Sequence, residues 1–424
     1  MKRKFRIIVG MLLLAIPLCL NAQVKPAKES KNSTVGNKPK KEKVEAGKTE
    51  KPVSPTKPES TAKPTKPQSN TNSPKATKPE NSSNTVKPEK PEKPGQPEKP
   101  REALETLKIT GFAQGMYQAN LNDEFELQDN TFRMRRVRLS IEAPLSRTMF
   151  FKIQGDFTRS PMLVDAYVKY RPCKEFALQV GQFKTPFTIE SPINPVNLEI
   201  FDYGEIIQQL GGYKDVCGVG GLGRDIGVMA SGSFFPMKGK YNLVDYSVGV
   251  FNGNGPTTTD NNNRKDIVGR LDVHPGLKDL TLSGSYYCGK YSKDDNVNCT
   301  RNRWAAGAQY NNKKLVLRGE YVGGETGKKI DLEENSLYNS NGYYALAGYN
   351  FSIGKDKSQT LMPVLRYEHF TADEAVANGG TNWYTAGINY WPVKTVNFKL
   401  DYSLVQKESG TNSHRVVGIL SYKF

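Results

Sequence analysis

From residue 107 onward, apolar and polar residues alternate one by one over many short stretches of the chain. Residues 136–143 and 396–404, for example, place aliphatic or aromatic side chains at every second position, with charged and polar side chains between them. The same holds for residues 149–157 and 164–171, and the apolar face of all four stretches carries no charge. A period of two predicts β-strands, and an uncharged apolar face is what a bilayer requires of a strand that crosses it.

Sixteen segments of this kind follow one another along the chain. They are residues 107–118, 132–143, 148–158, 162–171, 176–184, 225–234, 242–252, 265–273, 280–289, 302–310, 315–323, 342–352, 361–370, 382–391, 395–405 and 413–424. The connections after odd-numbered segments are long and polar (185–224, 253–264, 290–301, 324–341, 371–381), and most of those after even-numbered segments are short. We therefore expect an all-β fold, a 16-stranded antiparallel transmembrane β-barrel over residues 105–424, with long loops outside and short turns inside.

The first 104 residues have a different character. Residues 1–22 combine four basic residues, a short apolar run and a small residue before Gln23, which predicts a signal peptide. Residues 23–104 are rich in Lys, Pro and Glu and lack Phe, Trp and Tyr, so we expect a disordered periplasmic linker. Of the net charge of +17, +4 belongs to the signal peptide, +9 to the linker and +4 to the remaining chain. The basic composition therefore gives no evidence of a nucleic-acid partner.

The last segment ends the chain on an aromatic residue. Leu420, Tyr422 and Phe424 share one face of this segment. The arrangement resembles the C-terminal signal of outer-membrane barrels. Together with the signal peptide it predicts insertion into the outer membrane of a Gram-negative bacterium, in contact with its lipid.

Three motifs, in this order, resemble those of the phosphate-selective porin O and P family. They are Gly181-Gln182-Phe183-Lys184-Thr185-Pro186-Phe187, Arg224-Asp225-Ile226-Gly227 and Asn252-Gly253-Asn254-Gly255. The resemblance covers residues 107–424. It implies a sixteen-stranded barrel, usually a homotrimer, whose third outer loop folds into the lumen. It also implies a passive diffusion channel for small hydrophilic solutes, with anions such as phosphate as candidates.

The alternation also predicts which charged side chains face the lumen. Basic candidates outnumber acidic ones by twelve to ten, so the lumen is nearly balanced. Two hypotheses stay open for each basic residue: a cross-strand pair with an acid, or a place in a ladder that guides anions. The basic candidates are Arg136, Arg138, Lys152, Lys169, Arg171, Arg270, Arg303, Arg318, Arg366, Lys399, Arg415 and Lys423.

The third loop, residues 185–223, is acidic and raises a difficulty for phosphate. Its charged residues are Glu190, Glu199, Asp202, Glu205 and Asp215 against Lys214 alone, a balance of −4. Lining a constriction, these carboxylates would oppose an anion. They could instead bind a divalent cation or pair with arginines of the wall.

Few residues suggest other chemistry. Cys288 and Cys299 flank the fifth outer loop, and we expect a disulfide between them in the oxidising exported compartment. The three histidines lie far apart in the sequence and form no metal-ligand or triad-like pattern, so we expect no enzyme, metal or cofactor. The alternative function is structural: an outer-membrane protein held to the cell wall through the lysine-rich segment 23–104.

Overall fold

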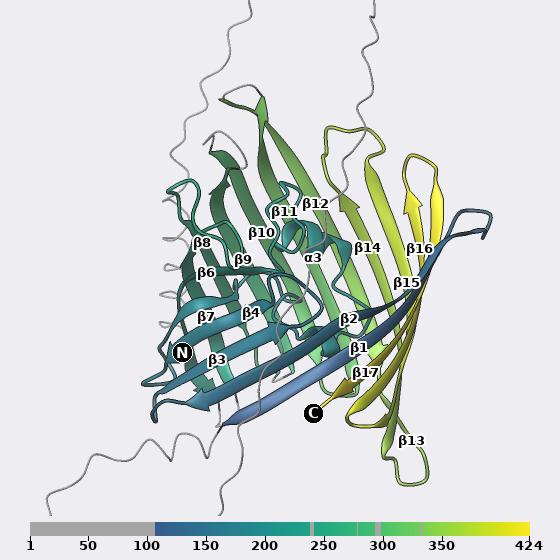
Figure 1. Ribbon diagram of the computed structural model, residues 1–424, viewed down its shortest axis with the longest axis horizontal. Helices are drawn as coiled ribbons and strands as arrows, with labels where there is room; N and C mark the ends of the chain where they lie inside the picture. Colours follow the sequence, from purple (N-terminus) through teal and green to yellow (C-terminus); the bar gives the residue numbers. More distant parts are fainter. Residues whose placement is uncertain (1–106, 238–240, 278, 293–297, 331–332) are drawn as a thin grey trace, which may run out of the picture. The chain divides into compact units, whose positions relative to one another are not determined.

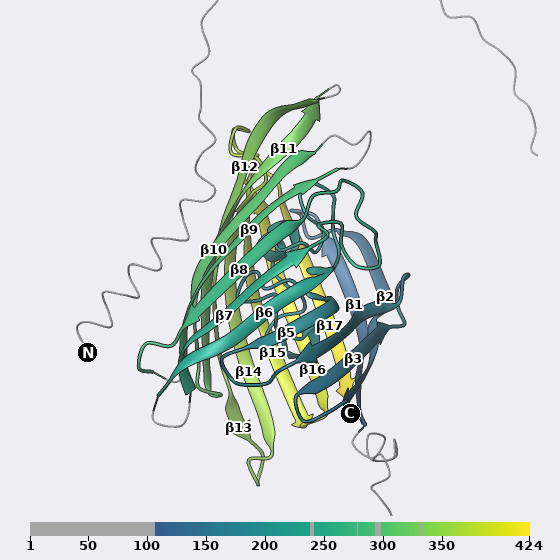
Figure 2. The same cartoon turned by 90° about the vertical axis from the view of Figure 1, so that its left-hand side faces the viewer.

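The computed structural model describes residues 107–424, apart from residues 238–240, 278, 293–297 and 331–332. The predicted signal peptide (1–22) and linker (23–104) lie outside the described residues. Within the described part, all strands belong to one antiparallel sheet, which curves around a lumen (Figures 1 and 2).

Each predicted segment corresponds to a strand of the wall. The strands are β1 (Lys108–Leu121), β2 (Leu127–Pro144), β3 (Met149–Asp156), β4 (Leu163–Tyr170), β5 (Ala177–Lys184), β6 (Arg224–Met237), β7 (Tyr241–Phe251), β8 (Asp266–Val273), β9 (Leu280–Tyr291), β10 (Cys299–Asn311), β11 (Leu315–Ile330), β12 (Glu333–Tyr349), β13 (Phe351–Ile353), β14 (Gln359–Thr371), β15 (Gly380–Val393), β16 (Val396–Lys407) and β17 (Asn412–Lys423). The largest departure is the β11–β12 hairpin. It continues as a paired ribbon well beyond the predicted ends of its two strands.

The wall has sixteen strands because β12 and β13 are two parts of one strand. Only Asn350 separates them, and both pair with β14. The first and last strands also pair, from Phe112 opposite Lys423 to Leu121 opposite His414. The sheet therefore closes on itself, and no strand edge presents unpaired backbone groups to lipid. The predicted 16-stranded antiparallel barrel is confirmed.

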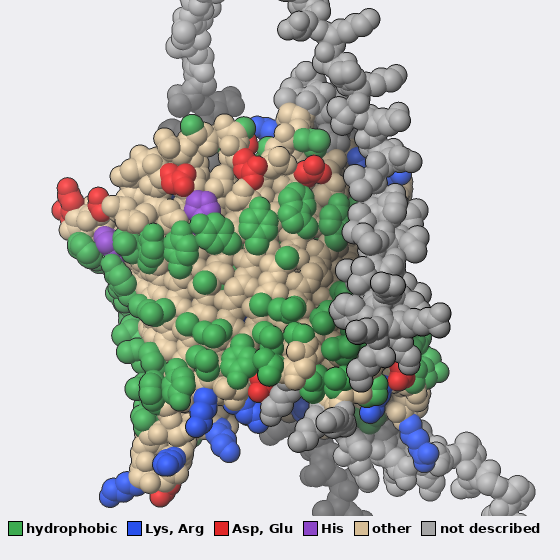
Figure 3. All heavy atoms as spheres, turned by 180° about the vertical axis from the view of Figure 1, so that it is seen from behind, with side chains coloured by type: hydrophobic (Ala, Val, Ile, Leu, Met, Phe, Trp, Pro, Cys, Tyr) green, Lys and Arg blue, Asp and Glu red, His purple; other side chains and the backbone are tan. Residues whose placement is uncertain are grey.

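Strand β16 shows how side chains divide between the two faces of the wall. Phe398 and Leu400 point outward and are 47% and 58% exposed, whereas Lys399 and Asp401 point inward and are 4% and 1% exposed. On the face seen in Figure 3, hydrophobic side chains form bands between the two ends of the barrel, and charged side chains gather at those ends. The chain thus places apolar groups where lipid surrounds the barrel and polar groups in the lumen.

In the described part of the chain, the helical elements lie in the third loop and are short. They are η1 (Pro195–Asn197) and α3 (Glu205–Leu210). No helix among the described residues is long and apolar enough to cross a membrane.

A charge on the outer face tests which surface meets lipid. Leu365 lies in the middle of β14 and is 65% exposed. We expect Leu365→Arg to lower the free energy of unfolding in lipid vesicles by about 2–4 kcal/mol, because the guanidinium must enter the hydrocarbon. The matched control is Val376→Arg, since Val376 is 55% exposed but lies in an outer loop. Urea unfolding of both variants checks this, and equal effects would contradict the assignment of faces.

Candidate functional site

The third loop leaves the wall after β5 and crosses the lumen before it rejoins the wall at β6 (Figures 1 and 2). Its helix α3 contacts β11, β12 and β14 on the opposite side of the barrel. Ile206, Ile207 and Leu210 of this helix are at most 2% exposed. The expected inward folding of the loop is therefore present in this structure.

Apolar side chains on the inner face of the wall receive the loop. Val322, Tyr344 and Phe370 belong to one buried cluster with Ile206 and Ile207. A second cluster joins Phe201 of the loop to Met116, Val417 and Ile419 of β1 and β17. Burial of these surfaces removes apolar area from the water in the lumen, which stabilises the inward position of the loop.

Glutamates of the loop bind arginines of the wall. Arg366 donates to Glu190 Oε2 at 2.6 Å, and the other oxygen of Glu190 accepts from the backbone N–H of Gly204 at 3.0 Å. Arg318 donates to both oxygens of Glu199, at 3.0 and 2.9 Å. A bidentate pair of this kind fixes direction as well as distance, so these contacts determine where the loop lies.

Asp215 lies between two arginines of β10. Arg301 and Arg303 each approach one of its carboxylate oxygens at 3.0 Å, and the side chain of Asp215 is fully buried. Burial alone would raise the pKa of this carboxyl, but the two guanidinium groups outweigh it and hold the pKa at about 2. Asp215 is therefore ionised at neutral pH.

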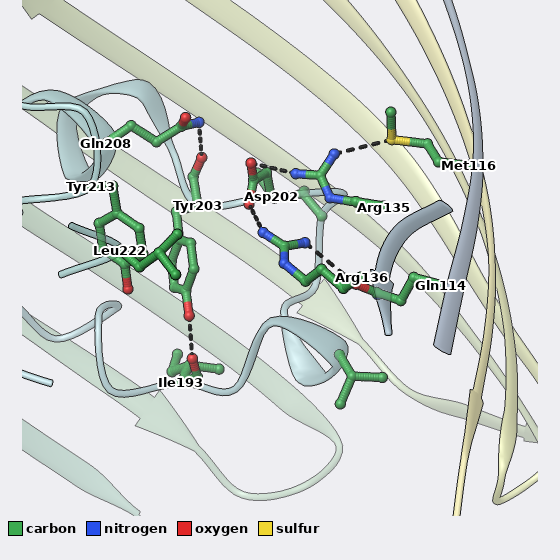
Figure 4. Close-up of polar contacts among 12 residues, drawn as sticks. Gln114, Met116, Arg135, Arg136, Ile193, Asp202, Tyr203, Gln208, Tyr213 and Leu222 are labelled. Carbon is green, nitrogen blue, oxygen red and sulfur yellow. Dashed lines mark hydrogen bonds and ion pairs between the residues drawn. The ribbon is translucent and has the colours of Figure 1, made fainter. Parts of the chain in front are cut away.

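Asp202 occupies a similar place on the other side of the barrel, between Arg135 and Arg136 of β2 (Figure 4). Arg136 also donates to Gln114, and Arg135 donates to the sulfur of Met116. Burial opposes the ionisation of Asp202, but the two arginines hold its pKa at about 2.

Four of the five predicted loop acids are thus paired with wall arginines. The exception is Glu205, which accepts from Gln209 and lies 4.0 Å from Lys214, both in the loop itself. Of the two alternatives that the sequence left open, the structure shows the pairing with the wall. No group of acidic, histidine or cysteine side chains in the described part of the chain is arranged to hold a metal ion.

Most of the predicted basic residues bind the loop or a wall acid. Arg136, Arg303, Arg318 and Arg366 hold loop acids, while Lys399 and Arg270 donate to loop carbonyls, and Arg270 also binds Asp272. Arg138 pairs with Asp156, and Lys152 pairs with Glu142. Arg415 lies over the ring of Phe201 at 4.6 Å. Lys169 is on the wall, Arg171 is in the turn after β4, and Lys423 ends β17.

Four functional cations were missing from the sequence prediction. Arg135 is the extra residue of a β-bulge, because Gln114 of β1 pairs with Arg136 and Gly115 pairs with Met134. The bulge breaks the alternation, so Arg135 and Arg136 both reach Asp202. Arg224 and Arg301 lie one residue outside the predicted strands, and Lys184 ends β5, where its Nζ donates to the carbonyl of Ile193 and the hydroxyl of Tyr203.

The predicted disulfide does not fit the observed register. Cys288 is opposite Asn302, and Cys299 is opposite Tyr291, so three positions separate the two cysteines along the β9–β10 ladder. Three positions correspond to about 10 Å. A disulfide needs Cα atoms closer than about 7 Å, so this prediction is wrong for the described structure.

The loop leaves space in the lumen on one side. A cavity of about 270 Å³ lies between β2–β5 and the loop segment that contains Asn194 and Pro195. Its charged lining is Arg138, Lys152, Lys184, Arg224 and Asp165. A second cavity, where the loop meets Arg224, Arg301 and Arg303, is only about 20 Å³. Of these two cavities, the one along β2–β5 has room for water and small solutes.

Comparison with known structures finds the same fold in outer-membrane channels. The outer membrane channel DcaP of Acinetobacter baumannii is 16% identical, with a TM-score of 0.53 over 75% of this chain and 97% of that one. An anion-selective porin from Comamonas acidovorans is 13% identical, with a TM-score of 0.55 over 75% and 99%. OmpT of Vibrio cholerae in its trimer form is 11% identical, with a TM-score of 0.50 over 75% and 100%. No curated protein sequence matches this chain significantly.

A closed sixteen-stranded barrel with a loop folded into its lumen defines a porin, a passive channel of the outer membrane. The family model for phosphate-selective porin O and P matches residues 107–308 and 296–422. The chain therefore belongs to the phosphate-selective porin O and P family, as its motifs indicated.

Because the ion pairs between the third loop and the wall are buried, we expect one substitution to loosen the loop. We expect Asp215→Asn to leave buried Arg303 without this counter-charge and Arg301 with only Asp266, 3.7 Å away, at a cost of about 3–5 kcal/mol, and so to loosen the loop. Single-channel recording in a planar bilayer should then show a larger and less steady conductance. The matched control is Glu205→Gln, which changes a loop carboxylate whose ion pair lies within the loop and should change the conductance much less.

The pH dependence of the conductance gives a second test of the ion pairs made by Asp202 and Asp215. Because the pKa values of Asp202 and Asp215 are held at about 2, below the ordinary 3.8, their pairs stabilise the loop fully above about pH 4. That stabilisation is lost as the pH falls from about 4 through 2. The unsubstituted channel should therefore be steady at pH 5 and become like Asp215→Asn near pH 2. A channel that is equally steady at both pH values would contradict the role of these pairs.

Proposed function

We propose that solutes cross this porin along the β2–β5 side of the lumen and that the path prefers small hydrophilic anions, phosphate among them. The observation that carries the proposal is the charge of the cavity lining, where four basic side chains face one acid. Asp156 and Glu142 neutralise two of the four, and Asp165 is bound by Arg224. One positive charge remains in excess, so the preference for anions is modest.

Among the four basic side chains of the cavity lining, Lys184 is the one without an acidic partner. Its ammonium group donates to backbone carbonyls of the third loop and to a tyrosine hydroxyl, and these partners are neutral. It lies at the end of β5, where the chain leaves the wall for the loop. In its protonated form, Lys184 attracts anions and repels cations along a narrow passage.

The acids of the loop do not oppose this path. Glu190 and Asp215 are fully buried, and Glu199 is 9% exposed at its side chain. Each carboxylate is bound by arginines, so the charge of −4 in the loop is largely neutralised on the side away from the cavity. Modest anion selectivity is therefore compatible with an acidic third loop.

Three copies of the chain form the working unit in this proposal. OmpT, which shares the fold, has a trimer form. The outer face of this barrel has an apolar groove of about 830 Å³ across β1, β2 and β15–β17. Gly115 and Gly418 form its floor, with Phe132, Leu400 and Leu420 around them. We assign the groove to the neighbouring copy, and the mass of the detergent-extracted protein tests this directly.

The linker 23–104 lies on the periplasmic side in this proposal, because both ends of an even-stranded barrel lie there. The conducting role does not depend on the linker. Contact between its lysines and the cell wall is the structural alternative, and it is compatible with a channel.

Neutralising each partner of one ion pair in turn tests the preference for anions. In a salt gradient across a planar bilayer, we expect the reversal potential of the unsubstituted channel to show a modest preference for anions. Lys152→Gln should move it towards cations, and Glu142→Gln should move it further towards anions. Both variants lose the same ion pair, so a structural effect would move both in one direction.

Two results would contradict the proposal. One is a preference for cations in the unsubstituted channel, and the other is a shift of the same sign in the two variants. Replacing chloride by phosphate in the gradient then measures whether the path distinguishes these two anions.

A further inference from the structure

The two rims of the barrel carry opposite charge. The described periplasmic turns (145–148, 171–176, 274–279, 312–314, 354–358, 394–395) contain eight basic and three acidic side chains. The described outer loops (122–126, 157–162, 252–265, 372–379, 408–411) contain seven acidic and three basic side chains. Figure 3 shows basic side chains below the apolar surface on one face and acidic side chains above it.

The basic side chains of the periplasmic rim are available for an external partner. Arg147, Lys313, Lys314, Lys355, Lys357 and Lys394 are exposed. Lys152, Lys214 and Lys265 form ion pairs, and none of these three lysines belongs to this rim.

The rim lies directly beside the surface that meets lipid. Lys394 follows Val393, which is 52% exposed on the outer face, and Arg147 lies two residues after Leu145, which is also 52% exposed. Long basic side chains at such a boundary place their stems along apolar surface and their charges at the depth of the lipid phosphates. The basic positions also recur in turns around the barrel, which suits a ring of small ligands better than one large partner.

We propose that this basic ring, defined as the basic residues of the periplasmic turns and strand ends, binds the phosphate groups of anionic phospholipids in the periplasmic leaflet. The attraction between clustered lysines and an anionic membrane surface is electrostatic and is screened by salt. The acidic outer rim lacks this attraction, so the charge difference also favours one orientation of the barrel. The inference rests on the outer-membrane location and not on the selectivity of the channel.

The test uses the full-length protein in vesicles of phosphatidylethanolamine, with or without an equal amount of phosphatidylglycerol. We expect phosphatidylglycerol to raise the temperature at which the barrel unfolds by several degrees at low salt, and less at high salt. A variant with Lys313, Lys314, Lys355, Lys357 and Lys394 all changed to Gln should lose most of this rise. The matched control neutralises five acids of the outer rim: Asp123→Asn, Glu124→Gln, Glu126→Gln, Asp373→Asn and Glu374→Gln. The control should keep the rise.

A second measurement keeps the proposal testable if the lysine variant folds poorly. Native mass spectrometry of the unsubstituted protein, extracted from mixed vesicles, should detect retained phosphatidylglycerol in excess over phosphatidylethanolamine. Equal retention of the two lipids would overturn the proposal, as would a full temperature rise in the lysine variant. Sedimentation with purified cell walls that depends on these lysines, without any effect of phosphatidylglycerol, would assign the ring to the cell wall instead. If the channel prefers anions but phosphatidylglycerol does not change its unfolding temperature, this inference fails and the proposed function stands.

Discussion

The pairing of loop carboxylates with wall arginines is the interaction on which the lumen of this porin depends. An arginine such as Arg303, 1% exposed, or Arg366, 3% exposed, is tolerable in the wall only when a carboxylate meets it. Asp215 and Glu190 are equally buried and need those arginines. The buried charges of the loop and those of this part of the wall are stable only when they are paired with each other. The loop is therefore packed against the wall as part of the folded barrel.

The same pairing decides where the lumen stays open. The loop covers the side of the barrel formed by β8–β17, where it finds both apolar surface and arginines. It meets β2 at the Asp202 pair, while Lys184 holds the loop segment that follows β5. What remains is the cavity beside β2–β5, with its slight excess of positive charge. The anion preference therefore comes from the basic side chains of β2–β5, which the loop does not cover, and not from the composition of the loop.

Local patterns of the sequence predicted the barrel because strand alternation and lipid exposure are local constraints. A lipid-facing position such as Leu400 excludes charge whatever its partners are, so its pattern can be read from the chain alone. The path of the loop depends on contacts between distant residues, such as Glu199 with Arg318, which no local pattern contains. One signal was present in the sequence: Val322 and Phe370 are apolar although they lie on the inner face. They mark the surface that the loop covers.

The failed predictions have equally specific causes. The bulge at Arg135 changes the register by one residue, and alternation cannot anticipate an inserted residue. Cys288 and Cys299 flank one loop, but the β9–β10 ladder extends past the predicted ends of both strands and separates them. Proximity in sequence across a hairpin predicts proximity in space only when the register is known.

A cross-link between the loop and the wall tests directly whether the loop rests where these ion pairs place it. The backbone N–H of Thr188 donates to the hydroxyl of Ser285 on β9 at 3.3 Å, so these positions of the loop and the wall lie side by side. The double variant Thr188→Cys, Ser285→Cys should form the disulfide in intact outer membranes, and the conductance of the oxidised channel should equal that of the reduced one. If the thiols remain unlinked, or if linking them sharply lowers the conductance, then the loop does not normally rest against this wall and the account fails.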